Sequence, residues 1–242
     1  GRTIFRDSHR GGHGTTNFYK AIRESVNTYF YVFSQEVGVQ KLAKTATDYG
    51  LGDKTGIDIP GEERGLIPTP EWKKEKRKEK WLPGNLVNMS IGQGDVLTTP
   101  LQMIMVYQGL ANNGIMYKPT VVDKFVSFDG KVEVKQPEIL RKLPFKPENI
   151  KIIREALKEP VNKPGGTARI LYFSNLPVSA KTGTAQNTGC KDNHSWMEGY
   201  FPSDNPEIVF ISLVEGGGYG AAASGDLVRK FIIKYNEKYN KS

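Results

Sequence analysis

The chain has 242 residues, of which 38% are hydrophobic and 25% charged, and its formal net charge is +8. This composition excludes the disordered and fibrous classes and supplies enough apolar side chains for one sizeable core, so we expect one domain over residues 1–242. No apolar run approaches the ~18 residues that a membrane-spanning helix needs.

The first part of the chain predicts two helices and then an irregular connection. Thr16 can cap a helix whose apolar residues recur at helical spacing over residues 18–33. A second helix is predicted over residues 39–49, where Gly50 ends it. Residues 53–70 are rich in Gly and Pro, which indicates a connection with only short extended pieces.

The middle of the chain predicts a helix, a hairpin and another helix. Thr99 is a good cap for the helix over residues 100–111, which has Pro at its first position. Residues 120–135 predict a hairpin, because Asp129-Gly130 supplies the positive φ values that a tight turn demands. An amphipathic helix follows over residues 148–159.

The last third predicts three strands, over residues 178–185, 195–201 and 208–214, and a final helix over residues 221–239. The third strand is apolar on both alternating faces, which is typical of a strand covered above and below and paired along both edges. The preceding strand can pair with one edge, but no later segment is typical of a strand that could pair with the other. We therefore expect an α+β fold whose sheet takes further strands from elsewhere.

Cysteine and histidine are too few and too scattered for a metal site. The single Cys190 and the histidines His9, His13 and His194 form no ligand cluster at metal spacing, so we expect neither a metal nor a cofactor. The densest charge run, residues 73–80, is typical of a solvated helix or loop, although such a surface can also lie near anionic lipid head groups. No nucleic-acid-binding module accompanies it, and we expect no nucleic-acid partner.

Short motifs in the chain suggest serine acyl transfer. One broad class of such enzymes combines Ser-x-x-Lys, which carries the nucleophile, with Ser-x-Asn and with Lys-Thr-Gly on a strand. Ser-x-Asn occurs at residues 25–27 and 203–205, and Lys-Thr-Gly occurs at residues 54–56 and 181–183. Because strings this short also arise by chance, the context of each copy must decide between them.

Context favours one Lys-Thr-Gly copy over the other. Residues 54–56 lie in the Gly- and Pro-rich connection, where Gly serves a turn, and turn chemistry also explains residues 203–205 between two strands. Residues 181–184 instead continue an extended run, in which Gly183 lacks a side chain and lets a substrate backbone approach. We therefore interpret residues 181–184 as the functional copy.

The other candidate motif, Ser25-Val26-Asn27, lies in an apolar helical context. Its two small polar side chains need partners, which an inward-facing polar cluster would provide. The alternative is that both side chains simply form hydrogen bonds within a helix, and the three residues of the motif alone do not exclude this.

Longer sequence strings decide between the functional and the purely structural interpretation of Ser25-Val26-Asn27. They are Gly12-His13-Gly14, Ser25-Val26-Asn27-Thr28-Tyr29-Phe30-Tyr31, Thr55-Gly56-Ile57-Asp58-Ile59-Pro60-Gly61-Glu62, Ser90-Ile91-Gly92-Gln93-Gly94, Thr99-Pro100-Leu101-Gln102 and Lys181-Thr182-Gly183-Thr184-Ala185. In this order they resemble class B penicillin-binding proteins, most of all the elongation-type transpeptidases called penicillin-binding protein 2. The resemblance extends from about Gly12 to the final helix, and its long strings are far more specific than the short motifs.

One motif of this family is absent from the sequence. No serine has a lysine three positions later, whereas the family's Ser-x-x-Lys precedes its Ser-x-Asn, so we expect the nucleophile upstream of Gly1. The resemblance implies the penicillin-binding, serine transpeptidase fold, an antiparallel sheet flanked by helices, here lacking the upstream strands and the nucleophile helix. Residues 1–242 would then be the larger, C-terminal part of one transpeptidase domain, inactive by themselves.

The resemblance also implies a role for each site residue. The complete enzyme would cleave the D-Ala-D-Ala bond of a peptidoglycan stem peptide through an acyl-enzyme, and β-lactams would acylate the same serine. Ser25 would relay a proton, and Asn27 would hold the substrate amide and brace the upstream lysine. Lys181 would add positive charge where the substrate carboxylate binds, and the hydroxyls of Thr182 and Thr184 would donate hydrogen bonds to it. The backbone N–H of Thr184 would form half of the oxyanion hole.

Two alternatives of different kinds stay open. A β-lactamase or β-lactam sensor uses the same motifs, and the rate of deacylation separates a β-lactamase from a transpeptidase. A non-catalytic scaffold that has lost its nucleophile would only bind partners in wall elongation. The resemblance further implies an upstream helical anchor in the cytoplasmic membrane, a location on the outer, periplasmic face, and membrane proteins of wall elongation as partners.

Overall fold

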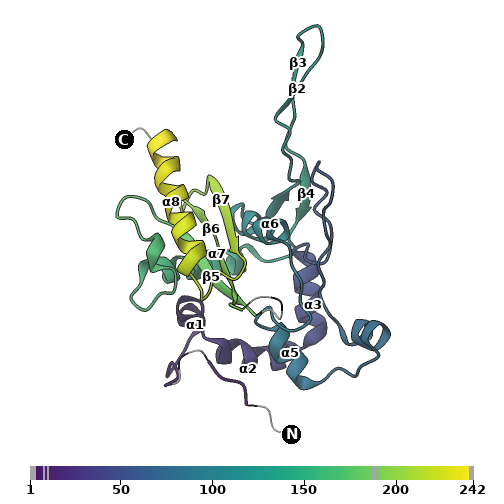
Figure 1. Cartoon of the computed structure of the whole chain (residues 1–242), viewed down its shortest axis with the longest axis vertical. Coiled ribbons are helices and arrows are strands. Elements are labelled where there is room, and N and C mark those ends of the chain that lie inside the picture. Colours follow the sequence, from purple (N-terminus) through teal and green to yellow (C-terminus); the bar gives the residue numbers. More distant parts are fainter. Residues whose placement is uncertain (1–3, 8, 10, 187–188, 190, 240–242) are drawn as a thin grey trace.

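The computed structural model describes residues 4–7, 9, 11–186, 189 and 191–239 (Figure 1). At its centre lies a three-stranded antiparallel sheet in the order β5-β6-β7, made of β5 (Ser179–Ala185), β6 (His194–Phe201) and β7 (Ile208–Val214). The three strands predicted from the last third of the sequence are therefore confirmed. Cys190, for which the sequence indicated no metal-binding role, lies outside the described residues.

Helices cover both faces of this sheet (Figure 1). Helix α8 (Ala222–Tyr239) lies on one face, where Val228 and Ile232 pack with Ala180 and Met197 of the sheet. Helices α6 (Pro100–Ala111) and α7 (Pro147–Asn162) lie on the other face, where Tyr200 of β6 packs with them. Because side chains alternate along a strand, the residues on the α6 and α7 face include Lys181 and its cross-strand neighbours.

The chain before the sheet also forms several short helices and helical turns. They are α1 (Phe18–Glu24), α2 (Asn27–Val37), α3 (Val39–Asp48), α4 (Pro70–Trp72), the π-helical turn η1 (Lys73–Arg77), α5 (Pro83–Met89) and the 3₁₀ turn η2 (Arg169–Leu171). The predicted helix over residues 18–33 is broken between α1 and α2, at Ser25 and Val26. The proposed cap at Thr16 is wrong, because the side chain of Asn17 accepts the hydrogen bond from the N–H of Lys20, 2.9 Å away.

The cap predicted for α6 is correct and closes as a capping box. The Thr99 hydroxyl accepts from the N–H of Gln102, and the Gln102 side chain accepts from the N–H of Thr99. Gln102 is almost fully buried and its amide also donates to the carbonyls of Asp53 and Arg64. The start of α6 is thereby joined to the Gly- and Pro-rich connection.

Two small hairpins extend the molecule away from the sheet. Strands β2 (Lys124–Val126) and β3 (Val132–Val134) form the predicted hairpin, which projects from the body in Figure 1. At its base, the Asp58 carboxylate accepts hydrogen bonds of 2.9 Å from the N–H of Val121 and from Lys135 Nζ. Strands β1 (Ile115–Tyr117) and β4 (Ile139–Lys142) pair below it and were not predicted, because such short strands carry little periodicity.

The outer edge of β7 has no strand partner within the part of the chain that the structure describes. This agrees with the expectation that the strand over residues 208–214 lacks a neighbour on one side. Of the described helices, none combines the length and the apolar character needed to cross a membrane.

Candidate active site

The structure brings together two motifs that lie far apart in the sequence. Lys181 Nζ, on β5, donates a 2.7 Å hydrogen bond to Ser25 Oγ, which is 156 positions away. The same amine donates a 2.8 Å hydrogen bond to the carbonyl of Thr182. The hydrogen-bond partner of the Ser25 hydroxyl is therefore a lysine on the sheet and not a group within its own helix. This is the inward-facing polar cluster that was considered for the motif.

The backbone at Ser25 is held in an unusual conformation that presents its hydroxyl to the sheet. Ser25 caps the C-terminus of α1 in the left-handed region, with φ 56° and ψ 49°, and its N–H donates to the carbonyl of Ala21. A residue with a Cβ pays about 1 kcal/mol for this conformation, which glycine usually occupies at such a position. The next residue, Val26, is 2% exposed and anchors the turn in the interior.

The third motif residue, Asn27, begins helix α2 and is partly buried. It stands beside Tyr31, one helical turn later. Burial raises the pKa of the Tyr31 hydroxyl and the Asp7 carboxylate raises it further, whereas a side-chain hydrogen bond with Asn27 acts in the opposite direction. Asn27 thus lies on the same short turn as Ser25, with its amide among polar groups.

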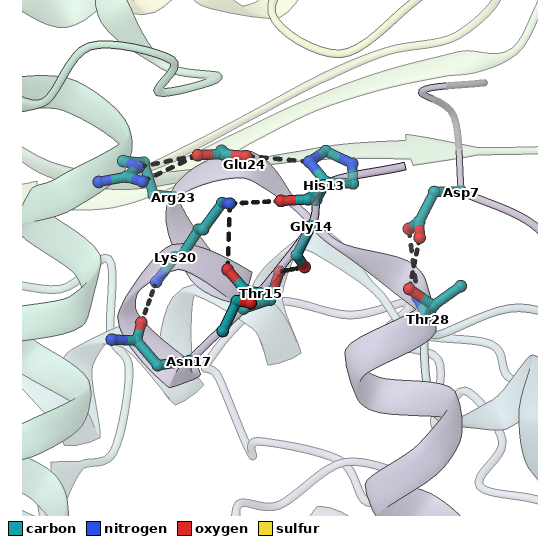
Figure 2. A network of polar contacts seen from close by, with 10 residues as sticks. Asp7, His13, Gly14, Thr15, Asn17, Lys20, Arg23, Glu24 and Thr28 are labelled. Atoms are coloured by element: carbon teal, nitrogen blue, oxygen red, sulfur yellow. Dashed lines mark hydrogen bonds and ion pairs between the residues drawn. The ribbon is translucent and has the colours of Figure 1, made fainter. Parts of the chain in front are cut away.

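The N-terminal segment fastens this turn on both sides, as Figure 2 shows. Before the turn, Glu24 lies 2.9 Å from His13 Nδ1 and accepts a 2.8 Å hydrogen bond from Arg23. After it, Asp7 accepts hydrogen bonds from both the N–H and the hydroxyl of Thr28. The hydrogen bond with His13, more than any other contact, lowers the pKa of the Glu24 carboxyl. The turn is therefore positioned by contacts that the short motifs do not include.

The opposite face of β5 makes a second set of contacts. The Thr182 hydroxyl donates a 2.8 Å hydrogen bond to the Thr167 hydroxyl, and the Thr184 hydroxyl accepts one of 2.8 Å from the N–H of Gly220. Both threonines thereby hold β5 against the loops that follow α7 and precede α8. Sequence reasoning missed Thr167, for which no sequence signal was available.

Gln93 lies next to the end of β5, and sequence reasoning did not assign it to the site. Its Nε2 donates a 3.2 Å hydrogen bond to the carbonyl of Thr184. Gln93 belongs to the string Ser90-Ile91-Gly92-Gln93-Gly94, so the signal was present in the resemblance, although no role was attached to it. This contact brings the loop after α5 to the site.

Gly183 lies in close contact with the strand beside it. A Cβ built on Gly183 would lie 3.0 Å from Cβ of Trp196, the residue opposite it on β6, closer than most real contacts allow. Among the described residues, no strand pairs with the outer edge of β5. An edge of this kind offers free backbone groups to an extended ligand.

Electrostatics set Lys181 apart from the other lysines. Burial lowers its pKa to about 8, and the nearby Glu198 carboxylate opposes this shift. An amine with a pKa this close to neutrality can carry positive charge and still exchange a proton. Glu198 was not anticipated, although a glutamate within a largely apolar strand is itself a signal.

The rejected motif copies have structural explanations. At Lys54-Thr55-Gly56, the Glu62 carboxylate accepts hydrogen bonds of 2.5 and 3.0 Å from the N–H groups of Thr55 and Gly56. Gly56 has φ +74°, as a turn requires. Residues 203–205 lie in the turn between β6 and β7. Both copies are therefore turns, as predicted.

No group of His, Cys, Asp and Glu in the described ranges has the geometry to hold a metal ion. The chemistry that the arrangement can support is that of its amine, hydroxyl and amide groups. A cation on β5 that contacts a serine hydroxyl, next to an open strand edge, is suited to bind an anionic, extended acyl donor.

Comparison with known proteins places the chain in a family. The family model described as the penicillin binding protein transpeptidase domain matches residues 2–233. A peptidoglycan D,D-transpeptidase MrdA of Acinetobacter baumannii is 32% identical over 243 residues, covering 91% of this chain and 34% of the relative.

Solved structures give the same result. A complex between penicillin-binding protein 2 and MreC from Helicobacter pylori matches with a TM-score of 0.84 and 33% identity, over 99% of this chain and 43% of that chain. Penicillin-binding protein 2 of Pseudomonas aeruginosa, in complex with WCK 5153, matches with a TM-score of 0.84 and 29% identity, over 96% of this chain and 51% of that chain. This chain thus spans between a third and about half of the length of these relatives.

Proposed function

This chain belongs to the penicillin-binding protein transpeptidase family, and from that membership we propose that it is the larger, C-terminal part of the domain that cross-links peptidoglycan in a D,D-transpeptidase of wall elongation. The observation that carries the proposal is the 2.7 Å hydrogen bond between Lys181 Nζ and Ser25 Oγ. Chance copies of two short motifs, 156 positions apart, would have no reason to meet across the fold.

The reaction begins when a serine hydroxyl attacks the carbonyl of the D-Ala-D-Ala bond. An ester forms to the enzyme, the C–N bond breaks, and the terminal D-alanine leaves with a proton. An amine of a neighbouring stem then attacks the ester and releases the serine. Ser25, bonded to Lys181, is suited to relay the proton toward the departing nitrogen, because its hydroxyl can both donate and accept.

The acyl donor binds along the outer edge of β5. Its carboxylate lies near the Lys181 ammonium, while Asn27 holds its amide. The contacts of that carboxylate with the hydroxyls of Thr182 and Thr184 require both hydroxyls to turn from the opposite face of β5, where they are hydrogen-bonded to Thr167 and Gly220. Gly183 leaves room for the extended backbone of the donor. The N–H of Thr184 supplies one oxyanion donor, and the loss of one such donor costs roughly 3–4 kcal/mol of transition-state stabilisation.

We place the nucleophile outside the given residues, because none of their serines stands three positions before a lysine. The test is covalent labelling by a fluorescent penicillin. The 242-residue chain should stay unlabelled, and the longer protein that includes the upstream segment should label. Stable labelling of the 242-residue chain would overturn the placement of the nucleophile.

The same experiment, followed over time, addresses the other candidate functions. A transpeptidase keeps its penicilloyl group for long periods, whereas a β-lactamase releases it quickly. A longer protein that carries no Ser-x-x-Lys and never labels would instead be the non-catalytic scaffold. Slow release from a labelled longer protein is the expected result.

We propose the partners from the titles of two similar structures, and the location from the resemblance to the family. The comparison includes a complex with MreC and one from a peptidoglycan synthase complex that couples polymerization and crosslinking. We therefore expect wall-elongation membrane proteins as partners, and β-lactams and stem peptides as ligands. The domain would lie on the outer face of the cytoplasmic membrane, held by an anchor that the described helices do not include.

A further inference from the structure

Glu198 is a buried carboxyl that lies directly behind the candidate site. It stands on β6 opposite Lys181 on β5, in register across the antiparallel ladder. Residues paired in this way have Cβ atoms about 4.5–5.5 Å apart and point to the same face of the sheet. Glu198 is only 8% exposed, and its Oε2 has no hydrogen-bond partner among the described residues. An unpartnered carboxyl oxygen in such a place is costly and calls for a reason.

Within the part of the chain that the structure describes, the cation that acts on Glu198 is Lys181. Lys181 faces it from β5, Ile211 lies opposite it on β7, and Tyr200 lies two residues along its own strand. Helix α6 contributes the buried phenol of Tyr107, whose pKa is raised by burial first and then by the charges of Glu198 and Tyr200. The charge that can compensate an ionised Glu198 is therefore the ammonium of Lys181.

We infer that Glu198 is a positioning residue, whose buried carboxylate keeps the Lys181 side chain charged where that side chain contacts Ser25. This role rests on the proposed function, because it concerns the same amine that would receive the anionic acyl donor. Glu198 lies on β6, one strand away from the open edge of β5, so it acts through Lys181 and not on the reacting atoms.

The physical reason is the cost of a desolvated ammonium. Burial lowers the pKa of Lys181 to about 8, and the Glu198 carboxylate is the group that counteracts this. Burial likewise raises the pKa of Glu198 to about 7, against the pull of Lys181. Each charge thus makes the other more favourable. Without Glu198 the amine would lose its proton at a lower pH, and a neutral amine attracts a carboxylate far less strongly.

The first experiment measures the Lys181 amine directly in the longer protein. The ¹³Cε resonance of Lys181 is assigned by its disappearance in Lys181→Arg and is then titrated by NMR. Glu198→Gln keeps the shape of the side chain and should lower the pKa of Lys181 by at least one unit. Glu198→Asp should keep most of the wild-type value, and Glu215→Gln, at an exposed position after β7, should change nothing.

The outcome against the inference is an unchanged Lys181 titration in Glu198→Gln. Chemical denaturation of each variant establishes that the compared proteins are folded. Should Glu198→Gln fail to fold, Glu198→Asp answers the same question, because its shorter side chain withdraws the charge and should lower the pKa by a smaller, measurable amount.

The second experiment tests the consequence for the reaction in the longer protein. Acylation by a fluorescent penicillin is followed as a function of pH. In Glu198→Gln, the fall of the acylation rate at alkaline pH should begin at a lower pH than in wild type. The acylation rate of the variant should therefore be at least fivefold below that of wild type at pH 8, and closer to it at pH 6. A shifted Lys181 titration without this shift in the acylation rate would refute the positioning role. If the wild-type longer protein is not acylated at all, the proposed function fails. The Lys181 titration still tests whether Glu198 and Lys181 are electrostatically coupled.

Discussion

The hydroxyl of Thr182 donates a 2.8 Å hydrogen bond to the hydroxyl of Thr167, which joins strand β5 to the loop after helix α7. The N–H of Thr167 in turn donates to the carbonyl of Arg23 near the end of α1. A single residue thus connects the strand that carries Lys181 to the helix that leads into Ser25. The two motifs are held together by their surroundings as well as by their own contact.

Replacing Thr167 by valine should weaken this connection. The substitution leaves the Thr182 hydroxyl, at a position only 8% exposed, without its partner, and a buried unsatisfied group of this kind costs about 1–3 kcal/mol. Thr167→Ser keeps a hydroxyl and should stay within ~0.5 kcal/mol of wild type. Chemical denaturation measures both, and equal stabilities of the two variants would contradict the importance of the bond.

Replacing Lys181 by alanine should slow penicillin acylation of the longer protein by at least tenfold, because the site loses its positive charge. The chain provides a matched control in its second Lys-Thr-Gly string. Lys54→Ala, at an exposed position in the turn, should leave the rate unchanged. Stopped-flow acylation decides the matter, and equal rates for wild type and Lys181→Ala would remove this lysine from the site.

Two substitutions at Ser25 separate its hydroxyl from its backbone. Ser25→Ala and Ser25→Gly both remove the hydroxyl that Lys181 contacts, so both should slow acylation of the longer protein strongly. Their stabilities should differ, because φ is 56° here and glycine adopts this region freely. Ser25→Gly should be more stable than Ser25→Ala by about 1 kcal/mol. The prediction fails if alanine proves the more stable replacement.

Glu24 should make stability depend on acid pH. Its folded-state pKa lies below the ordinary 4.5, chiefly because of the hydrogen bond with His13. The stabilisation is therefore present above pH 4.5 and disappears as the pH falls through the lowered folded value. Glu24→Gln should cost roughly 1–2 kcal/mol at pH 7 and progressively less in acid. Unfolding curves from pH 7 to pH 3 measure this.

The control for Glu24 is Glu36→Gln, at an exposed position on α2. It should be near wild type at every pH. A Glu24→Gln deficit that persists unchanged to pH 3 would mean that the carboxylate charge is not what holds the turn.

Glu62 should be important for stability although it lies in no catalytic motif. Its carboxylate accepts from the N–H groups of Thr55 and Gly56, so Glu62→Ala should cost roughly 1–3 kcal/mol. Its neighbour Glu63 is exposed, and Glu63→Ala should cost less than ~0.5 kcal/mol. Thermal denaturation compares the two. Penicillin acylation of the folded longer protein should persist in Glu62→Ala, which would distinguish a turn from a second site.

Much of the secondary structure was predictable because its signals are local. The strand over residues 208–214 is apolar at every position but one, and Thr99 with Gln102 forms a capping box within one turn. The break at Ser25 was only half predictable. The apolar spacing over residues 18–33 continues across it, and nothing in that spacing shows that Ser25 adopts a left-handed conformation.

The sequence by itself determined the family and the strand that carries Lys181, and it favoured residues 181–184 over residues 54–56 as the candidate site, because each of these depends on strings or on neighbours along the chain. Only the tertiary structure decided that Lys181 reaches Ser25, that Thr167 links the two motifs, and that Glu198 lies behind the amine. These are contacts between residues far apart in the chain, and their free energy depends on distance, burial and strand register, none of which a linear sequence contains.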